Sequence, residues 1–387
     1  MVIDLGLPLD ADIDGPHPLP PISGLEHPDP QLVGIVLSHT HPDHTGLISQ
    51  IHGGSRIYGP ASAEAISKAA STFTSDREQR SSWRAMSDGH ALTLGPFTVT
   101  PLLVDHSAFE SYALLVEAGG RRLLYSGDLR GHGRKAHLWR RLLERPPQPV
   151  HALLLEGTRL SRAPGHNTSE VDVEQGLADL CTATSGMVLV FYSGQNIDRL
   201  VSVYRAARRT GRKLVLDLYG AAIAEATGNA TIPHAHWNGV RVLVPNAQRR
   251  RVIEKQAFDR IDRVRANRIF PEQLAGRAAD LVLTMRGSMT REIERANCLR
   301  GASAVWSMWP GYLQGPDGSP VLDWLQRNDI ALHTLHASGH ASVADLRALA
   351  SAIAPDRVVP IHTAAPERYP DVFSRIEPHA DGEWWTV

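Results

Sequence analysis

Ser38-His39-Thr40-His41-Pro42-Asp43-His44 places three imidazoles and one carboxylate at positions 39–44. Imidazole nitrogens and carboxylate oxygens are the ligands that zinc, iron and manganese accept in proteins. The stretch follows the apolar run Leu32–Leu37, which predicts a short buried strand that enters a tight turn. Because strand side chains repeat every two residues, His39 and His41 share one side, while Asp43 and His44 lie past the bend. The pattern H-x-H-x-D-H therefore predicts two metal ions held by one turn; the alternative is a His-rich surface loop without a metal.

Composition describes a globular chain of 387 residues, 42% hydrophobic and 21% charged, long enough for two domains. The net charge of −1 gives no support for a basic nucleic-acid groove, but it does not exclude one. Two cysteines imply no disulfide framework and suit a reducing cytosol. The first residues lack a basic region before an apolar one, and no apolar run is long enough to cross a membrane. We therefore expect a cytoplasmic protein.

Further acids and imidazoles stand where predicted strands end. These positions are Asp4, His39, His106, Asp128, Glu156 and, late in the chain, His362. Strand ends clustered at one edge of a sheet are where rigid scaffolds place chemistry. Asp4 could hydrogen-bond the His-rich turn and orient a ligand, as carboxylates behind metal ligands do. The alternative for Asp4 is an ordinary strand terminus.

Local patterns predict the elements around these positions. We expect Ala61–Arg84 to be helical and Pro101 to break the β-rich stretch 97–104 into two strands. Tyr112–Glu117 and Arg122–Tyr125 pair as a hairpin across Gly119-Gly120.

From about Pro164 the pattern changes to alternating buried strands and helices. Strand Met187–Tyr192, helix Asp198–Arg209 and strand Lys213–Leu218 are examples, and Ala304–Met308 is the last predicted strand of this part. Such alternation predicts a doubly wound α/β domain with a parallel sheet. We interpret it as an insertion, residues 164–312, between two outer segments, residues 1–163 and 313–387, that fold back together.

The motifs together resemble the metallo-β-lactamase fold, in its β-CASP branch of nucleases such as RNase J. H-x-H-x-D-H carries the likeness to the fold, and the motifs that follow in order carry the likeness to the branch: His106, Asp128, Glu156, His340 and His362. The resemblance implies an αββα sandwich with an inserted β-CASP doubly wound α/β domain. It implies that His106 is the third-motif ligand, that Asp128 is the bridging aspartate and that His362 is the last metal ligand. It also implies that Glu156 is the acid that opens the insertion and that His340 is the histidine beside the scissile phosphate.

The resemblance has one ambiguity and three departures. His336 lies four residues before His340, and either could be the functional histidine; Gly339 favours His340, because glycine lets the backbone approach a ligand closely. RNase J-like chains have glycine where this sequence has Thr363. The usual first strands ahead of Asp4 are missing from this sequence, so we expect the sheet to start short. No long C-terminal domain follows Val387, which leads us to expect a different oligomer or substrate.

The resemblance also implies how two ions, expected to be zinc with manganese or magnesium as alternatives, would be shared. His39, His41 and His106 would hold one ion, and Asp43, His44 and His362 the other, with Asp128 bridging. A water between two such ions has a lowered pKa, and the resulting hydroxide would attack phosphorus in line. His340 would donate a hydrogen bond to the phosphate or protonate the leaving oxygen. Asp43, Asp128, Glu156 and His340 are accordingly the expected catalytic residues.

Three functions stay open at this point. The first is a metal-dependent nuclease, exo- or endonucleolytic, on single-stranded RNA or DNA, with RNA favoured and with a homodimer expected from the family. The second is a hydrolase of a small ester, thioester or lactone. The third is a catalytically silent nucleic-acid-binding subunit.

Two helix starts and a set of arginines are further candidates for phosphate binding. Segments 193–199 and 286–289 each follow a predicted strand and open a helix, where an anion could bind, although a plain N-cap explains them equally well. The arginines available for phosphate contacts, which could equally form solvated helical faces, are Arg199, Arg208, Arg209, Arg249, Arg250 and Arg251.

Overall fold

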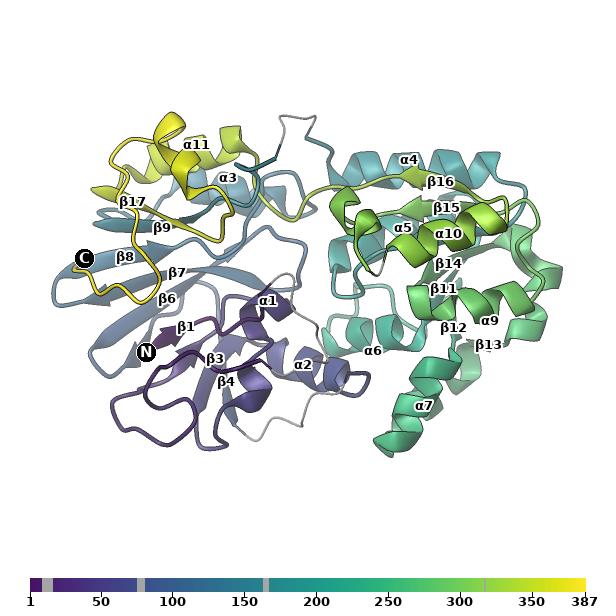
Figure 1. Cartoon of the computed structure of the whole chain (residues 1–387), viewed down its shortest axis with the longest axis horizontal. Helices are drawn as coiled ribbons and strands as arrows, with labels where there is room; N and C mark the ends of the chain where they lie inside the picture. The colour runs from purple at the N-terminus through teal and green to yellow at the C-terminus, as the bar shows by residue number, and fades with distance from the viewer. Residues whose placement is uncertain (9–16, 75–80, 163–166, 317) are drawn as a thin grey trace. The chain divides into compact units, whose positions relative to one another are not determined.

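The computed structural model of the chain describes residues 1–8, 17–74, 81–162, 167–316 and 318–387. The chain forms two compact units (Figure 1). Unit 1 comprises residues 1–64, 77–167 and 339–387, and unit 2 comprises residues 65–76 and 168–338. In the described residues, no helix is both long enough and apolar enough to cross a membrane.

Unit 1 contains two sheets. The first is parallel and has the order β1 (Val2–Ile3), β2 (Ile35–Val36), β3 (Arg56–Pro60), β4 (Ser82–Met86). The second has the order β17 (Arg357–Ile361), β9 (Ala152–Glu156), β8 (Arg121–Tyr125), β7 (Ser111–Ala118), β6 (Phe97–Val104), β5 (Leu92–Leu94). In the second sheet β17, β9 and β8 run parallel, while β8, β7, β6 and β5 pair antiparallel.

The alternation of side chains along each strand builds the layers of unit 1. Val36 and Tyr58 of the first sheet pack against Val99 and Leu114 of the second, which forms the core between the sheets. The neighbouring Ile35 faces the opposite way and shares a core with Leu47, just after the short helix α1 (Pro42–Thr45), and with Ile48 of η1 (Ile48–Gln50).

Two helices cover the outer face of the second sheet. They are α3 (Ala136–Glu144) and α11 (Val343–Ile353), which lie on the same side of β9 and β17 (Figure 1). Leu142 of α3 and Leu349 of α11 share a core with Leu153 and Val358 of the sheet. The 3₁₀ helix η7 (Pro366–Asp371) adds Tyr369 to this core. Helical segments thus enclose two sheets, which is the sandwich that the sequence predicts.

Unit 2 is built on one seven-stranded parallel sheet. The order is β13 (Arg268–Ile269), β12 (Val240–Leu243), β11 (Lys213–Asp217), β14 (Leu281–Met285), β10 (Val188–Phe191), β15 (Ser303–Trp306), β16 (Ala331–Thr334). Its helices are α4 (Glu170–Ala183), α5 (Ile197–Arg209), α6 (Leu218–Ala226), α7 (Asn246–Glu254), α8 (Asp259–Val264), α9 (Thr290–Arg295) and α10 (Ser319–Arg327). All residues of β10 and β14 are buried, as expected for parallel strands covered on both faces.

A buried ion pair ties four parts of unit 2 together. The fully buried Arg199 guanidinium of α5 donates to both carboxylate oxygens of Glu170, the first residue of α4, at 3.2 and 3.0 Å. It also donates to the carbonyl and hydroxyl of Ser307, after β15, and to the Ala337 carbonyl, after β16. Arg199 is therefore not available for phosphate, and that prediction is wrong.

Three predictions about the elements differ from the structure. The predicted helix Ala61–Arg84 is wrong beyond α2 (Ala63–Ser71), because Ser82–Met86 forms β4 beside β3; residues 75–80 of that prediction lie outside the described residues. The predicted break at Pro101 is also wrong, because β6 continues through it. β5 pairs only with residues 97–99 of β6. Pro101 lies beyond that pairing, so its missing amide hydrogen costs no hydrogen bond to β5.

The third difference concerns the end of the insertion. The sequence places its last strand at Ala304–Met308 and its boundary at 312, but β16 pairs in parallel with β15 and extends this sheet by one strand. Val321 and Trp324 of α10 also pack in the core of unit 2, which continues to Ser338. The predicted boundary between 163 and 164 lies outside the described residues.

Candidate metal centre

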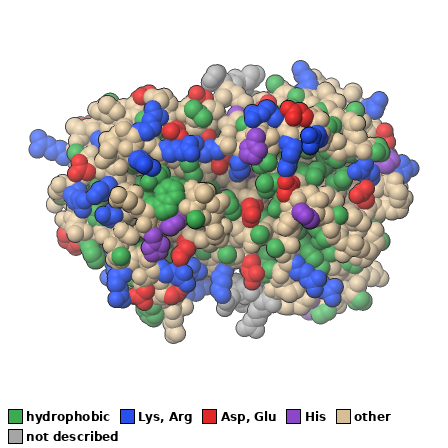
Figure 2. All heavy atoms as spheres, turned by 180° about the vertical axis from the view of Figure 1, so that it is seen from behind, with side chains coloured by type: hydrophobic (Ala, Val, Ile, Leu, Met, Phe, Trp, Pro, Cys, Tyr) green, Lys and Arg blue, Asp and Glu red, His purple; other side chains and the backbone are tan. Residues whose placement is uncertain are grey.

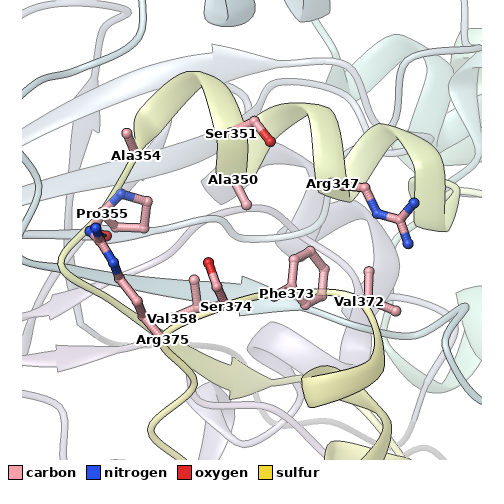
Figure 3. A pocket seen from close by; sticks show the side chains of 10 residues that line it. All are labelled: Arg347, Ala350, Ser351, Ala354, Pro355, Val358, Val372, Phe373, Ser374 and Arg375. Carbon is pink, nitrogen blue, oxygen red and sulfur yellow. Dashed lines mark hydrogen bonds between the residues drawn. The ribbon is translucent and has the colours of Figure 1, made fainter.

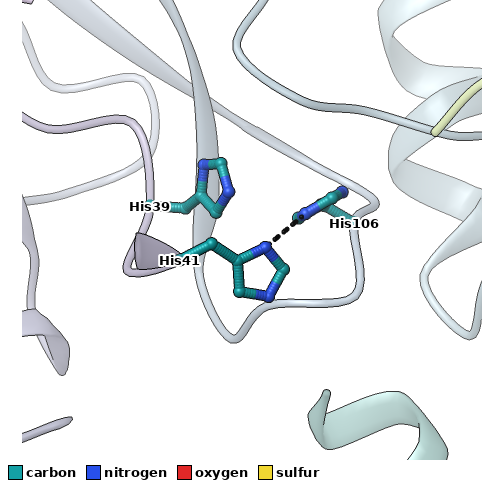
Figure 4. A group of neighbouring side chains, drawn as sticks. All are labelled: His39, His41 and His106. Atoms are coloured by element: carbon teal, nitrogen blue, oxygen red, sulfur yellow. Dashed lines mark hydrogen bonds between the residues drawn. The ribbon is translucent and has the colours of Figure 1, made fainter. Parts of the chain in front are cut away.

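Three of the predicted ligands meet at the ends of β2 and β6. His39 and His41 lie between β2 and α1, and His106 follows β6. One ring nitrogen of each lies within 4.8 Å of the others. His41 Nδ1 and His106 Nε2 are 3.2 Å apart, and Figure 4 shows the two rings directed at one another below His39. A zinc ion bound at about 2.1 Å in tetrahedral geometry separates two nitrogens by about 3.4 Å, so this spacing suits a shared ion.

Four other ligands form a second group around Asp128, which follows β8. Ligand atoms of Asp43, His44, Asp128 and His362 lie within 4.8 Å of one another. His44 Nε2 lies 3.3 Å from Asp128 Oδ2, and His362 Nε2 lies 3.2 Å from Asp43 Oδ2.

Asp128 also reaches the first group. Its Oδ2 atom lies 3.8 Å from His39 Nε2 and 3.9 Å from His106 Nε2. A carboxylate between two ligand groups is what a bridging ligand requires. Gly127 allows this position: it has φ of 53°, and a Cβ there would lie 2.7 Å from the Tyr112 carbonyl oxygen.

Asp4, at the end of β1, orients the His-rich turn. Its Oδ2 atom lies 2.7 Å from His44 Nδ1 and accepts the Tyr125 hydroxyl at the same distance. Its carboxylate also accepts the Ser38 amide and hydroxyl, each at 2.7 Å. This arrangement directs His44 Nε2 toward Asp128, so Asp4 is more than a strand terminus. The left-handed backbone of Asp4, with φ of 53°, is uncommon outside glycine.

The other ligand histidines have orienting partners too. His106 Nδ1 lies 2.6 Å from the Gly339 carbonyl, and a Cβ at Gly339 would lie 3.0 Å from the His106 ring. His362 Nδ1 lies 2.8 Å from the Thr158 hydroxyl. Ser38 and Thr158 are orienting partners that were not predicted. Nothing in the sequence around Thr158 reveals a partner 204 residues away.

Glu156 and His340 stand beside the second group. Glu156 is fully buried at the end of β9, accepts the Ala341 amide at 3.1 Å and lies 3.5 Å from His340 Nδ1. His340 Nδ1 is also 3.7 Å from Asp128 Oδ2. Of the two candidate histidines, His340 is therefore the one that the structure brings to this site. The predicted residues of unit 1 thus gather in one cluster.

Burial keeps the first group of imidazoles neutral. Burial lowers the pKa of His41 to about 4, and it places the pKa of His39 and of His106 well below the ordinary value. Neutral imidazoles have the lone pairs that metal coordination needs.

The second group holds protons where a cation would bind. Burial opposes the charged forms, but Asp128 and Asp4 raise the pKa of His44 well above its ordinary value. Burial likewise opposes charge on His362, but Asp128 and Asp43 raise its pKa to about 9. Burial favours protonation of Asp128, yet His44 and His362 hold its pKa well below the usual range.

The donor set fits divalent cations. His39 Nε2 and Asp128 Oδ1 are buried, and among the described residues neither finds a hydrogen-bond partner. A buried polar atom without a partner is costly unless something outside the chain satisfies it. Five imidazoles and two carboxylates aimed inward match the ligand preference of zinc or manganese.

Two other predicted positions have structural roles in unit 2. Asn196 caps α5 by accepting the Arg199 amide at 2.9 Å, which favours the plain N-cap interpretation of segment 193–199. Arg286 pairs with Asp217 at 2.5 Å and stacks over Tyr219.

A pocket of about 280 Å³ lies elsewhere in unit 1, between α11 and the segment that follows η7 (Figure 3). Arg347 and Arg375 stand toward opposite ends of it, and Phe373 and Val358 form apolar walls. None of its lining residues is a predicted metal ligand.

The fold and the ligand cluster define the class as a metallo-β-lactamase-fold protein with a second α/β unit in the position of a β-CASP insertion. The model of the β-lactamase superfamily domain matches residues 9–191. Ribonuclease J of Mycobacterium tuberculosis (strain ATCC 25618 / H37Rv) is 24% identical over 368 residues, 89% of this chain and 60% of that protein. Ribonuclease J of Sinorhizobium meliloti is 26% identical over 207 residues, 51% of this chain and 36% of that protein.

A crystal structure of a protein of unknown function from Enterococcus faecalis V583 has the same fold. The comparison of the two structures gives a TM-score of 0.77 at 22% sequence identity, and it covers 98% of this chain and 93% of the Enterococcus faecalis chain. The chain spans between about a third and three-fifths of the length of the curated relatives named above. Together, these matches support the predicted resemblance: the chain is similar to ribonuclease J and has the metallo-β-lactamase fold.

Replacing Asp4 with asparagine should weaken metal affinity by about 10- to 100-fold, the usual effect of removing an orienting partner. The amide keeps the shape of the carboxylate but loses the charge that holds the His44 ring. Competition with a chromophoric chelator measures the affinity. Tyr125→Phe is the matched control, because it removes another hydrogen bond to the same oxygen and should change affinity by less than about threefold. Equal affinities for Asp4→Asn and the wild type would contradict the orienting role.

Bound divalent metal should stabilise unit 1. A free concentration 100-fold above Kd adds about 2.7 kcal/mol to the free energy of unfolding, which for a unit of this size raises Tm by about 5–10 °C. We expect zinc or manganese to raise the Tm of chelator-treated protein, and EDTA to reverse the shift. A Tm that does not respond to either would be evidence against a metal site.

Proposed function

We propose that this protein is a metal-dependent phosphodiester hydrolase that acts on single-stranded RNA. The observation that carries the proposal is the position of Asp128, whose carboxylate lies within 4 Å of nitrogens from both ligand groups and of His340. The similarity to the ribonuclease J proteins supports the choice of RNA.

His39, His41 and His106 would hold one divalent ion, and Asp43, His44 and His362 a second, with Asp128 shared; zinc is the ion that we propose. When bound, such ions supply a water of lowered pKa and neutralise charge that builds on a phosphate. We propose that no side chain of the protein acts as a covalent nucleophile in the hydrolysis.

Two further residues would act beside the metal ligands: Glu156 positions His340, and His340 is the proposed proton donor. Glu156 fixes the loop of His340 through the Ala341 amide, so the imidazole keeps its place beside Asp128. The His340 side chain is 17% exposed, which leaves it open to a substrate. It would donate a hydrogen bond to the scissile phosphate or protonate the leaving oxygen.

A labelled-strand assay tests the proposal. Purified protein with zinc or manganese is incubated with 5′-labelled RNA, with DNA of the same sequence and with a chromogenic lactone. Shortening of the RNA strand is expected, and the product ladder separates exonuclease from endonuclease action. Hydrolysis of the lactone alone would replace the proposal with a small-ester hydrolase, and no turnover at full metal occupancy would replace it with a silent binding subunit. The cytoplasmic location and the homodimer stay predictions.

A further inference from the structure

Positive charge is concentrated in one segment of unit 2, outside the metal centre. Residues 241–280 contain ten of the 40 Lys and Arg residues of the chain but five of its 41 Asp and Glu residues. A chain with a net charge of −1 therefore has a strongly basic segment. The rest of the chain contains 30 Lys and Arg residues and 36 Asp and Glu residues. On the face of the molecule shown in Figure 2, Lys and Arg lie in several groups with Asp and Glu between them.

The segment lies at one edge of the unit 2 sheet. It runs from β12 through α7 and α8 to β13, which is the edge strand. In Figure 1, α7 lies beyond the end of the sheet formed by β12 and β13. Gln248 and Val252 of α7 are buried, whereas Arg249, Arg250 and Ile253 are exposed. Arg249 and Ile253 are four residues apart and so share one face of the helix.

Part of the positive charge has no acidic partner. Arg251, Arg263 and Arg265 form ion pairs with nearby acids. Within the part of the chain that the structure describes, Arg249, Arg250 and Arg260 form none. Three guanidinium groups are therefore available for an anion.

Exposed aromatic rings accompany these arginines. Phe258, in the turn between α7 and α8, is 53% exposed, and Phe270, directly after β13, is 44% exposed. The Arg268 guanidinium stacks over the Phe270 ring at 4.6 Å. Phe258 lies two residues before Arg260 in the chain, so exposed rings and arginines without acidic partners occur together in this segment. Alternating cationic groups and aromatic rings bind single-stranded nucleic acid, through phosphates and through base stacking.

We propose that α7, α8 and the turn after β13 form a binding surface for single-stranded RNA, which we call the α7–α8 surface. Arg249, Arg250 and Arg260 contact phosphates, and bases stack on Phe258 and Phe270. The choice of RNA as the strand rests on the proposed function. The surface acts on binding, not on chemistry, and so favours long substrates over short ones.

Binding of a 5′-labelled 20-nucleotide RNA to chelator-treated full-length protein tests the surface, because cleavage is prevented without metal. Two variants are compared with the wild type: Arg249→Gln/Arg250→Gln/Arg260→Gln and Phe258→Ala/Phe270→Ala. The arginine variant should bind at least about tenfold more weakly and lower the salt slope by about 2, since each phosphate contact on a single strand contributes about 0.7. The phenylalanine variant should bind the RNA at least about fivefold more weakly than the wild type.

A matched control uses exposed arginines of the same unit that also form no ion pair: Arg291→Gln/Arg295→Gln/Arg300→Gln. Circular dichroism checks that all variants are folded, and the control should bind within about twofold of the wild type. If the control weakens binding as much as the arginine variant, or if neither test variant weakens it, the α7–α8 surface is wrong. Loss of binding to anionic vesicles or of self-association, with RNA binding unchanged, would also overturn it.

Cleavage of a dinucleotide by the metal-loaded variants separates this proposal from the proposed function. We expect the test variants to cleave the dinucleotide at the wild-type rate while KM for the 20-nucleotide RNA rises. If the wild type binds RNA through this surface but cleaves no phosphodiester, the proposed function fails and the surface stands. If the wild type cleaves RNA and the test variants bind it unchanged, the surface fails and the proposed function stands.

Discussion

Replacing Asp128 with alanine is expected to lower the rate of phosphodiester hydrolysis by at least about 10³-fold. The Asp128 carboxylate lies within 4 Å of nitrogens from both ligand groups, as a shared metal ligand must. Its loss removes a ligand that both ions would share and leaves His44 and His362 without their buried counter-charge. Lewis-acid stabilisation by a metal is worth several kcal/mol, and each 1.36 kcal/mol is a factor of ten in rate.

The measurement is the initial rate on labelled RNA, together with metal content by elemental analysis. Asp128→Asn removes the charge of the side chain but keeps its volume. This variant should lose nearly as much activity as Asp128→Ala, because an amide is a weak metal ligand. Glu117→Ala, an exposed acid on β7 that pairs with Arg122, is the control and should keep wild-type activity. A fully active Asp128→Ala with normal metal content would contradict the bridging role and the proposed mechanism with it.

The strand-end positions of the metal centre could be predicted because each depends on local sequence. An acid or imidazole directly after an apolar run is predicted to lie at the end of a strand, and this prediction does not depend on the rest of the chain. That His362 should meet Asp43 across 319 residues does not follow from either segment. It depends on the parallel pairing of β17 with β9. The expectation that His362 is a metal ligand came from the resemblance to a known fold.

Features set by tertiary context could not be predicted. β4 lies in a segment of helical composition, and its parallel pairing with β3 overrides that preference. Local rules predict that Pro101 breaks a strand. In the structure, the strand edge where the proline lacks an amide hydrogen faces no neighbouring strand at that residue. The sequence of β16 does not tell which of the two units it joins, and only its pairing with β15 places it in unit 2. Arg199 belonged with the exposed arginines by composition, and only the structure shows it buried against Glu170.

Arg199→Met is expected to destabilise unit 2 by about 3–5 kcal/mol. The substitution removes the guanidinium that pairs with Glu170 at a site where both side chains are fully buried, and leaving a buried charge without its counter-charge costs about that much. It also leaves the Ala337 carbonyl without its donor from Arg199. For a unit of about 180 residues this corresponds to a fall in Tm of roughly 6–20 °C. Thermal unfolding followed by circular dichroism measures the shift.

A double variant distinguishes the buried charge from lost packing. Glu170→Leu together with Arg199→Met replaces both charges by apolar groups, which is often neutral for buried pairs, and should therefore recover most of the stability lost in Arg199→Met. Arg205→Met is the matched control on the same helix: its side chain is 58% exposed and lies 3.8 Å from Glu174, so the change should stay within about 1 kcal/mol. If Arg199→Met unfolds at the wild-type temperature, Arg199 does not tie α4, α5 and the ends of β15 and β16 together. If the double variant is no more stable than Arg199→Met, the loss comes from the bonds to Ser307 and Ala337 and not from the unpaired carboxylate.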